Sequence, residues 1–323
     1  MHRNVKKLLL IGLRYHDYTA AIIDEISRQG FEVTYHEIQP RTVYLKTLKV
    51  FSPAAWQSSL DAHHRAILER ERGTSYDCVL FIQAHQFAVE NMRALREQQQ
   101  QAQFILYNWD SITTHDYRPH LGCFDQVFTF DPDDAATQGV EYLPLFCIRT
   151  FQGLQQRDQQ ERCVYFVGNI VSAQRYEALT AFKQHCVREG IGLRSFMACS
   201  PLVYTRLLRA GHLPTDVSFR SIAQAQFVDM VERSTTVFDF ANHRQSGYTM
   251  RIFENLCAGK KIITNAARIR REPFYSEDRI HVFEGLDFAG VKEFVQRDLA
   301  EPQLRFEQFH VQSFVRTLLG AVA

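Results

Sequence analysis

Short apolar runs alternate with helical segments along the chain. Near the N-terminus, Leu8–Leu13 is a continuous apolar run, which predicts a parallel strand covered on both faces. Apolar residues then recur at helical spacing from Ala20 to Ile26, and Gly30 ends the helix. Residues 31–38 predict a second strand. Together these segments form one βαβ unit, whose crossover we expect to be right-handed.

The same alternation continues to the C-terminus with one interruption. Residues 148–162 are polar and rich in glutamine, and we place the linker at 151–162. Strands alternating with helices on both sides of it predict two doubly wound α/β domains, at 1–150 and 163–305. An amphipathic helix within 306–323 could cross back to the first domain. Further strands are expected at 77–82, 104–108, 124–130, 163–168, 192–199, 235–240 and 260–265, with helices near 60–72, 89–101, 202–210, 221–232 and 249–258 and another that ends near 187.

The composition excludes several classes of protein. The 323 residues are 46% apolar and 23% charged, as in ordinary globular domains, which argues against disorder and coiled coils. Lys and Arg number 37 against 36 Asp and Glu, so the basic excess of a nucleic-acid-binding protein is absent. The seven cysteines include no C-x-x-C pair, which argues for a reducing compartment. No apolar run approaches the roughly 18 residues of a membrane span, and we expect a cytoplasmic protein.

The stretch with the most chemical content is 246–265, SGYTMRIFENLCAGKKIITN. Gly247 follows a predicted buried strand, and Thr249 can cap the next helix, whose N-terminus would suit a phosphate. A cation in the first turn, Arg251, is unfavourable against the helix dipole unless an anion is also present. Glu254 lies three residues further on and shares the face of Arg251. The alternative is that these two residues form only an exposed helical ion pair.

This Gly-x-Thr-x-Arg-x-x-Glu helix, followed by Ala-Gly-Lys-Lys and an apolar strand, resembles the donor-binding region of GT-B glycosyltransferases. It is similar in particular to bacterial enzymes that build lipopolysaccharide and capsule. The resemblance extends to LYNWDSI (106–112), FDQVFTFDPDDA (124–135), YLPLF (142–146) and FVGN (166–169). It implies an α/β protein of the GT-B fold, in which two Rossmann-like, doubly wound domains face each other across a cleft. The C-terminal domain of that fold holds the donor nucleotide.

The resemblance implies roles for individual residues of the expected helix and the loop before it. Glu254 would hold the ribose hydroxyls of the donor nucleotide, and Arg251 would neutralise phosphate charge. Three further residues would lie by the phosphates or the sugar, namely Gly247, Tyr248 and Thr249. The donor itself is a nucleotide sugar, which is a substrate, and no cofactor is expected.

The start of the second domain contributes to the same expected site. FVGN corresponds to the family's glycine loop, so Gly168 and Arg175 join the donor-binding residues. The alternative for Arg175 is a solvated side chain at a helix start. The second glutamate of the E-x7-E pattern found in many retaining enzymes falls at Ser246. The stereochemistry of transfer therefore stays open.

A base that takes the proton of the acceptor hydroxyl should lie in the first domain, at the end of a buried strand. Asp110 has this place, and the alternative is that it caps a following helix together with Ser111. His16 and Asp17, which follow the first strand, are second candidates. His85 follows another strand in the same topological position, and the pKa of histidine suits the role.

Other chemistries find little support among the motifs. Asp131, Asp133 and Asp134 are more typical of a helix cap and turn than of a metal site. No Asp-x-Asp of the metal-dependent GT-A type stands at a suitable place, so no metal is expected. A lone Gly12 without a G-x-G-x-x-G disfavours a dinucleotide oxidoreductase.

The sequence thus favours a metal-independent glycosyltransferase that moves a sugar from a nucleotide-activated donor to a glycan or glycolipid acceptor. The resemblance implies a place in bacterial surface polysaccharide biosynthesis. No nucleic acid partner is expected, and peripheral association with the inner face of the membrane is left open. Two alternatives remain. One is a nucleotide-sugar epimerase on the same scaffold, and the other is a non-catalytic envelope or spore-coat accessory protein that retains the fold.

Overall fold

The computed structural model describes residues 5–152, 154, 161–241, 246–301, 305–320 and 322. Its tertiary contacts divide the chain into two compact units. Unit 1 comprises Met1–Ile148, Arg244–Tyr248 and Gln308–Ala323, and unit 2 comprises Arg149–His243 and Thr249–Glu307. The C-terminal helix therefore belongs to unit 1. Within the described residues, no helix combines the length and apolar character needed to span a membrane.

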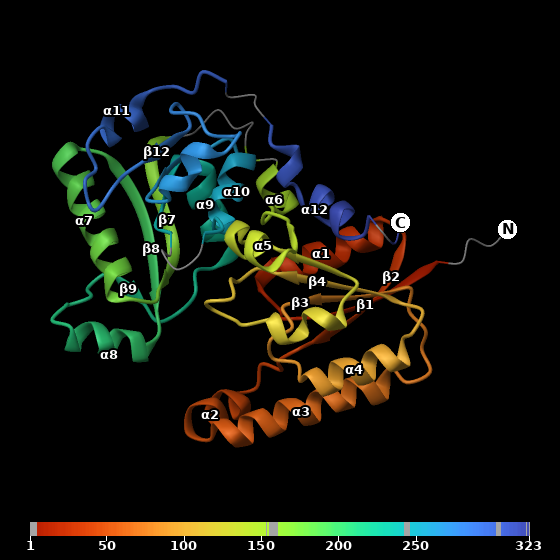
Figure 1. Ribbon diagram of the computed structural model, residues 1–323. Coiled ribbons are helices and arrows are strands. Elements are labelled where there is room, and N and C mark those ends of the chain that lie inside the picture. The colour runs from red at the N-terminus through yellow and green to blue at the C-terminus, as the bar shows by residue number, and fades with distance from the viewer. Residues whose placement is uncertain are drawn as a thin grey trace. The chain divides into compact units, whose positions relative to one another are not determined.

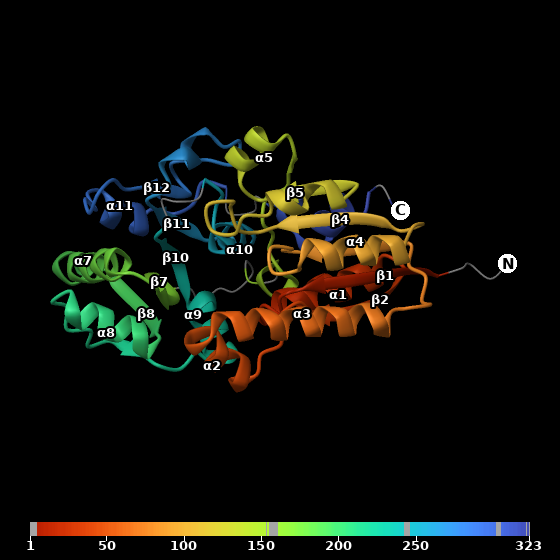
Figure 2. The ribbon, with the colours of Figure 1, turned by 60° about the horizontal axis from the view of Figure 1, so that its bottom comes forward.

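Unit 1 contains a parallel six-stranded sheet. Its strands follow the spatial order β2-β1-β3-β4-β5-β6, and Figure 2 shows β5, β4, β1 and β2 in that sequence across the sheet. The central strands are apolar along their whole length, because helices cover both faces. The strands are β1 (Lys6–Gly12), β2 (Phe31–Glu37), β3 (Cys78–Ile82), β4 (Gln103–Asn108), β5 (Gln126–Thr129) and β6 (Glu141–Tyr142).

The helices of unit 1 form two layers around this sheet. Figure 1 shows α1 (His16–Arg28) and α12 (Val311–Leu318) on one face, and α3 (Pro53–Arg70) and α4 (Val89–Gln98) on the other. Alternate strand residues such as Phe81 and Leu106 pack with the helices of the second layer in one buried cluster. The remaining helical segments are α2 (Val43–Phe51), η1 (Arg118–Cys123), a 3₁₀ helix, and α5 (Pro132–Gln138).

Unit 2 repeats this architecture with a second parallel six-stranded sheet, in the order β12-β11-β10-β7-β8-β9. Its strands are β7 (Glu161–Ile170), β8 (Gly192–Cys199), β9 (Val217–Ser218), β10 (Ser234–Asp239), β11 (Lys261–Thr264) and β12 (Ile280–Val282). Its helical segments are α6 (Arg149–Gln152), α7 (Ala173–Glu189), α8 (Pro201–Arg209), α9 (Gln224–Arg233), α10 (Met250–Cys257), η3 (Ala267–Arg271) and α11 (Val291–Gln296), with η4 (Glu307–Phe309) at its C-terminal limit.

The helices of unit 2 also cover both faces of their sheet. Figure 1 shows α7 and α11 on one face and α9 and α10 on the other. The first face has an aromatic core, in which the rings of Phe182 and Phe238 stack at 4.0 Å between centroids and Phe288 packs edge-on against both. Two layered α/β units with parallel sheets confirm the fold class expected from the alternation of apolar runs.

The segment predicted as a linker is partly regular. Helix α6 covers Arg149–Gln152 and β7 begins at Glu161, so regular elements enter both ends of the range 151–162. Residues 153 and 155–160 lie outside the described residues. The first two residues of β7 are exposed, which explains why the start of this strand has the polar composition of a linker.

Candidate functional site

Helix α10 of unit 2 is buried around almost its whole circumference. It begins after the loop that follows β10, a central strand of the sheet. Every residue from Ile252 to Cys257 is buried, including Glu254, which is 4% exposed. The alternative of an exposed ion pair on this helix is therefore wrong. A buried carboxylate and a half-buried arginine so close together call for specific partners.

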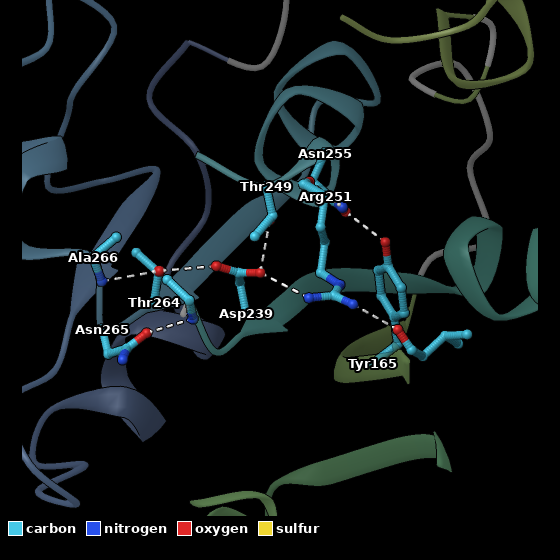
Figure 3. A network of polar contacts seen from close by, with 10 residues as sticks. Tyr165, Asp239, Thr249, Arg251, Asn255, Thr264, Asn265 and Ala266 are labelled. Carbon is cyan, nitrogen blue, oxygen red and sulfur yellow. Dashed lines mark hydrogen bonds and ion pairs between the residues drawn. The ribbon is translucent and has the colours of Figure 1, made fainter. Parts of the chain in front are cut away.

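The partner of Arg251 is Asp239, the last residue of β10 (Figure 3). Arg251 Nη1 donates to Asp239 Oδ1 at 2.7 Å. The hydroxyl of Thr249 donates to the same oxygen at 3.0 Å, and the hydroxyl of Thr264 donates to Oδ2 at 3.1 Å. Asp239 has no exposed surface, and these three donors stabilise its buried negative charge.

This network corrects two expectations about the start of α10. Thr249 stands at the N-cap position, but its side chain makes no capping bond and is directed to Asp239 instead. The anion that makes a cation acceptable in the first turn is Asp239, a residue of the protein. Sequence reasoning missed it, although an aspartate at the end of the apolar run TTVFDF is a signal that it could have used.

Asn255 links this network to the strand β7. Its amide group donates to the carbonyl oxygen of Arg251 at 2.8 Å, and its Oδ1 accepts a hydrogen bond from the hydroxyl of Tyr165 at 2.8 Å (Figure 3). Burial, followed by the negative charge of Glu254, raises the pKa of Tyr165, so this hydroxyl remains a donor. Hydrogen bonds of Thr249, Arg251 and Asn255 thus fix the first two turns of α10 to residues of the sheet.

Gly168 in β7 brings the two predicted arginines together. A Cβ atom at this glycine would lie 3.0 Å from Arg251 Nη2 and 3.5 Å from Arg175 Nη2. Both guanidinium groups also lie over the ring of Phe166, at 5.2 Å for Arg251 and 5.8 Å for Arg175. Arg251 Nη2 donates to the carbonyl oxygen of Val167 at 2.8 Å. The same Cβ atom would lie 2.9 Å from Phe166 Cζ, so the glycine leaves room for the ring and for the two guanidinium groups. Two cations held side by side in this way can bind a phosphate group through their remaining N–H donors.

The loop before α10 has a different environment from the one expected. Asp131 of unit 1 accepts hydrogen bonds from the backbone nitrogens of Ser246, at 2.8 Å, and Gly247, at 3.3 Å, and from the Ser246 hydroxyl. A Cβ atom on Gly247 would lie 2.5 Å from Phe130 Cε2, so this close packing requires glycine. The backbone nitrogen of Gly247 already has an anionic partner, and Tyr248 is buried at 3% exposure.

Asp131 also performs the capping role predicted for it. Its carboxylate accepts from the backbone nitrogens of Asp133, at 3.0 Å, and Asp134, at 3.2 Å, at the start of α5. Burial opposes ionisation of Asp131, but the bonds from the Ser246 side chain and from backbone N–H groups outweigh it and lower its pKa. The carboxylate of Asp134 accepts from Ile112 N at 2.8 Å, which anchors the loop after β4.

The carboxyl-terminal edge of the unit 1 sheet holds the predicted base. Asp110 follows β4, and its Oδ2 accepts a hydrogen bond from Gln83 Nε2. The same oxygen lies 3.8 Å from His115 Nε2. No helix begins in the described residues 111–117, so the alternative of a helix cap at Asp110 is wrong. A partly exposed carboxylate held in this way can accept a proton from a bound hydroxyl.

Gln83 holds a backbone conformation that is unfavourable for its residue type. Its φ is 63°, a positive value that no other described residue except glycines has. Its backbone nitrogen donates to the Tyr107 carbonyl oxygen at 2.9 Å. This conformation directs the side chain toward Asp110, and such strain is found where the surrounding structure enforces it at functional sites. Sequence reasoning missed Gln83, because nothing in the run VLFIQAH marks a positive φ.

His85 packs against His115 in a parallel stack, with 3.8 Å between ring centroids and 4° between planes. Burial, then the positive charges of His115, His120 and Lys49, lowers the pKa of His85 to about 4. Its imidazole is therefore neutral at physiological pH. Among the other candidates, Asp17 is exposed in the first turn of α1, where it favours the helix dipole, and the side chain of His16 lies outside the described part of the chain.

The sequence matches no family model and no curated protein. The structure, in contrast, is similar over nearly its whole length to solved enzymes. An α-glucosyltransferase in complex with UDP and a 13-mer DNA has 11% identity and a TM-score of 0.64, with 97% of this chain and 95% of that chain covered. The lipopolysaccharide outer core galactosyltransferase WaaB, in its apo form, has 13% identity and a TM-score of 0.59, with 98% and 99% covered.

An epimerase is also among the similar structures. The UDP-GlcNAc 2-epimerase from Neisseria meningitidis, bound to UDP-GlcNAc, has 9% identity and a TM-score of 0.56, with 98% of this chain and 99% of that chain covered. At such low identities the similarity establishes the fold and leaves the reaction open. The chain has the GT-B fold, as the resemblance in its sequence implied.

Proposed function

We propose that this chain is a glycosyltransferase that moves a sugar from a UDP-type nucleotide sugar to a glycan or glycolipid acceptor. The observation that carries the proposal is the convergence of Arg175 and Arg251 around Gly168 in a GT-B fold. Two guanidinium groups held side by side suit the diphosphate of such a donor. Two of the similar structures are complexes with UDP and with UDP-GlcNAc, which supports the same ligand class.

In the proposed donor site, the two arginines stabilise the negative charge that develops on the leaving diphosphate. Asp239 holds Arg251 in place through its bond at 2.7 Å, so the guanidinium group needs little reorganisation when the charge forms. The buried carboxylate of Glu254 accepts hydrogen bonds from the ribose hydroxyls. In this arrangement the two arginines bind the phosphates of the donor, and Glu254 binds its nucleoside.

In the proposed acceptor site, Asp110 is the general base of an inverting transfer. It takes the proton of the acceptor hydroxyl, whose oxygen forms a bond to the anomeric carbon of the donor sugar. The bond from that carbon to the phosphate oxygen breaks, and the nucleotide leaves with the electron pair. Gln83 orients the carboxylate through its hydrogen bond to Oδ2.

The donor site is tested by titration calorimetry with UDP and with uridine. We expect Arg175→Ala to weaken UDP binding about ten- to a hundredfold, the loss of a charge-assisted bond worth roughly 1.5–3 kcal/mol, and to leave uridine binding unchanged. Glu254→Ala should weaken both ligands. Arg188→Ala, an exposed arginine at the other end of α7, is the matched control. Unchanged UDP affinity in Arg175→Ala would remove the main support for the proposal.

We further propose a cytoplasmic enzyme of bacterial surface polysaccharide biosynthesis that associates peripherally with the membrane. Helix α2 supports this, because Tyr44, Val50 and Phe51 are 66%, 72% and 81% exposed on it. On a helix Tyr44 and Phe51 lie on one side, with Val50 about 100° away around the helix axis. Exposed apolar side chains of this size on an amphipathic helix suit the boundary of headgroups and acyl chains.

Flotation with anionic phosphatidylglycerol vesicles tests this association. Val50→Ser with Phe51→Ser should reduce the bound fraction several-fold. Leu213→Ser changes a side chain of unit 2 that is equally exposed, at 79%, and should not. Equal binding by all three proteins would contradict a role for α2 in membrane association.

A nucleotide-sugar epimerase is the second candidate, favoured by the similarity to the epimerase bound to UDP-GlcNAc. The two reactions differ in their need for an acceptor. Incubation with UDP-sugars alone, followed by chromatography of the nucleotide sugars, would reveal a new epimer in the second case. Release of UDP and free or transferred sugar supports the glycosyltransferase, and binding without turnover of any kind would indicate a non-catalytic protein.

A further inference from the structure

Three aromatic side chains gather at the carboxyl-terminal edge of the unit 1 sheet. Tyr15 precedes α1 in the loop after β1, Tyr18 lies in α1, and Trp109 follows β4. The Tyr15 ring lies 5.6 Å from the Trp109 ring and 5.7 Å from the Tyr18 ring, measured between centroids. Tyr15 is 46% exposed. We call these three residues the aromatic platform.

Buried aromatic rings pack against the inner side of the aromatic platform. Tyr18 packs edge-on against Phe146 at 6.4 Å, and Phe146 lies 4.3 Å from Phe314 of α12. Both phenylalanines are buried. A chain of packed rings thus fixes the inner side of the platform, so that ordering it on binding a ligand costs little entropy.

The backbone that bears Tyr15 is also fixed. Its nitrogen donates to the hydroxyl of Thr19 at 2.9 Å, and that hydroxyl donates to the Leu13 carbonyl oxygen at 3.0 Å. Thr19 is 4% exposed. The rigid loop keeps the large ring of Tyr15 in contact with solvent, and exposure of its apolar surface to water is unfavourable in free energy. A ligand that covers the ring would remove this unfavourable exposure.

Polar groups lie beside the aromatic platform. Asp110 directly follows Trp109, and Gln83 binds its carboxylate. Strands β1, β3 and β4, which precede Tyr15, Gln83 and Trp109 respectively, are neighbours in one parallel sheet, so their carboxyl ends meet at one edge. The edge therefore combines aromatic faces with a hydrogen-bond acceptor for a hydroxyl group.

We propose that the aromatic platform binds a pyranose ring of the acceptor, with the acceptor hydroxyl directed toward Asp110. The C–H groups on one face of a pyranose are apolar and pack on aromatic rings, while its hydroxyls need acceptors at the rim. The inference rests on the proposed function, since it names the side chains on which a sugar ring of that acceptor packs. It assigns Tyr15 and Trp109 to substrate binding.

A nucleobase is the other flat ligand that stacks on aromatic rings. The exposed charged groups beside the platform argue against it. Asp17 is exposed in the first turn of α1, and Arg14 is paired with Glu37 at 3.7 Å. Asp110 adds a second carboxylate, and the chain as a whole carries a net charge of only +1. An edge with exposed carboxylates repels the phosphates that accompany a base, whereas a neutral sugar is unaffected.

The two tryptophans of the chain make a direct experiment available. In Trp56→Phe, the indole of Trp109 is the sole tryptophan fluorophore. We expect a saturable change in its emission when this protein is titrated with methyl glycosides of glucose, galactose, mannose and N-acetylglucosamine and with their disaccharides, up to 100 mM. At least one of these sugars should bind in the millimolar range or tighter.

Variants of the same protein assign the binding to the platform. Tyr15→Ala should weaken the best sugar at least tenfold. Tyr44→Ala, which removes a tyrosine that is more exposed but lies on α2, should leave the affinity unchanged. Circular dichroism of each variant confirms that the fold is retained.

Each other result overturns the inference. No sugar of the panel altering the emission, or equal affinity in Tyr15→Ala, means that the platform does not bind a pyranose. Saturation by thymidine oligonucleotides without an effect of any sugar means that it binds a base. UDP binding by unit 2 is measured separately with Arg175→Ala, so failure of the platform and failure of the glycosyltransferase proposal are distinguished.

Discussion

The carboxyl-terminal edges of the two sheets share one architecture and carry opposite chemistry. The edge of unit 2 gathers the cations Arg175 and Arg251 around Gly168. The edge of unit 1 gathers the carboxylate of Asp110 with His115 and Gln83. In both cases the side chains come from segments that directly follow parallel strands, where open α/β sheets bind ligands.

The two edges also differ in how they hold their charged groups. In unit 2, Arg251 is positioned by a fully buried carboxylate, Asp239, and by a backbone carbonyl. In unit 1, Asp110 stays partly exposed, and its orienting residue, Gln83, is held by a backbone conformation with φ of 63°. The fold therefore places both charged groups at the edges of the sheets, while burial in one unit and backbone strain in the other determine how their side chains are oriented.

The largest effect should come from removing the buried charge in unit 2. Asp239→Asn leaves the half-buried guanidinium of Arg251 without its anion, which typically costs about 3–5 kcal/mol. Urea unfolding should therefore shift strongly to lower denaturant concentration. Asp229→Asn, which breaks an exposed bridge to Arg233 within α9, should cost under about 0.5 kcal/mol.

A double variant shows whether pairing is the cause. In Asp239→Asn with Arg251→Met neither charge remains, so most of the lost stability should return, because hydrophobic replacement of a whole buried pair is often neutral. A double variant no more stable than Asp239→Asn would mean that Asp239 acts through Thr249 and Thr264 rather than through the arginine.

The second largest effect concerns catalysis in unit 1. Asp110→Asn should reduce the turnover of sugar transfer by two or more orders of magnitude, the usual scale for a lost general base. The affinity for UDP should be unchanged, because its proposed ligands are in unit 2. Steady-state kinetics with calorimetry checks both, and turnover like that of the wild type would remove Asp110 from this role and leave His85 and Asp17 as candidates.

The strands and the sites were predictable to different degrees. Continuous apolar runs such as Leu8–Leu13 and 104–108 mark central strands, since a strand buried on both faces has an apolar residue at nearly every position. The short edge strands β9 and β12 were not predicted, because two or three residues carry no period. Helix α2 was also not predicted, because several of its apolar residues are exposed and do not form one buried stripe.

Contacts between distant residues account for what sequence reasoning missed in the sites. Arg251, Arg175 and Gly168 were identified from local motifs, and the structure brings them together. The bond between Asp131 and Ser246 joins residues 115 positions apart, and a local motif contains no information about such a pairing. Asp239 and Gln83 act by orienting another side chain, so their importance is visible only once the partner's position is known.

A smaller effect should come from Lys260, a second buried cation of unit 2. Lys260 is fully buried, and its ammonium group lies 3.5 Å from the carbonyl oxygen of Glu232. Burial lowers its pKa to about 8. Between pH 8 and the unfolded value of 10.5, the unfolded chain holds more protons than the folded one, so stability rises with pH across this window.

Lys260→Met tests this contribution. The variant should be about 2 kcal/mol more stable than the wild type near pH 7, where the penalty for burying the charge is complete. The difference should shrink as the pH rises from 8 to 10.5. Urea unfolding of both proteins at several pH values measures it, and a difference independent of pH would show that the substitution acts through packing alone.

The smallest effect separates strain from function in unit 1. Gln83→Gly places at a positive φ the residue that tolerates it best, so the strain of about 1 kcal/mol is relieved and the stability should be equal or slightly higher. Gln86→Gly, three residues on and without a positive φ, gains nothing from glycine and should lose up to about 1 kcal/mol. Glycine removes the amide of Gln83 together with the strain. If the hydrogen bond from this amide orients Asp110, Gln83→Gly should keep its stability and yet lose about tenfold in turnover, with UDP affinity unchanged. A variant that is more stable and fully active would show that the strained conformation contributes nothing to the acceptor site, and the contrast between the two edges would then rest on burial alone.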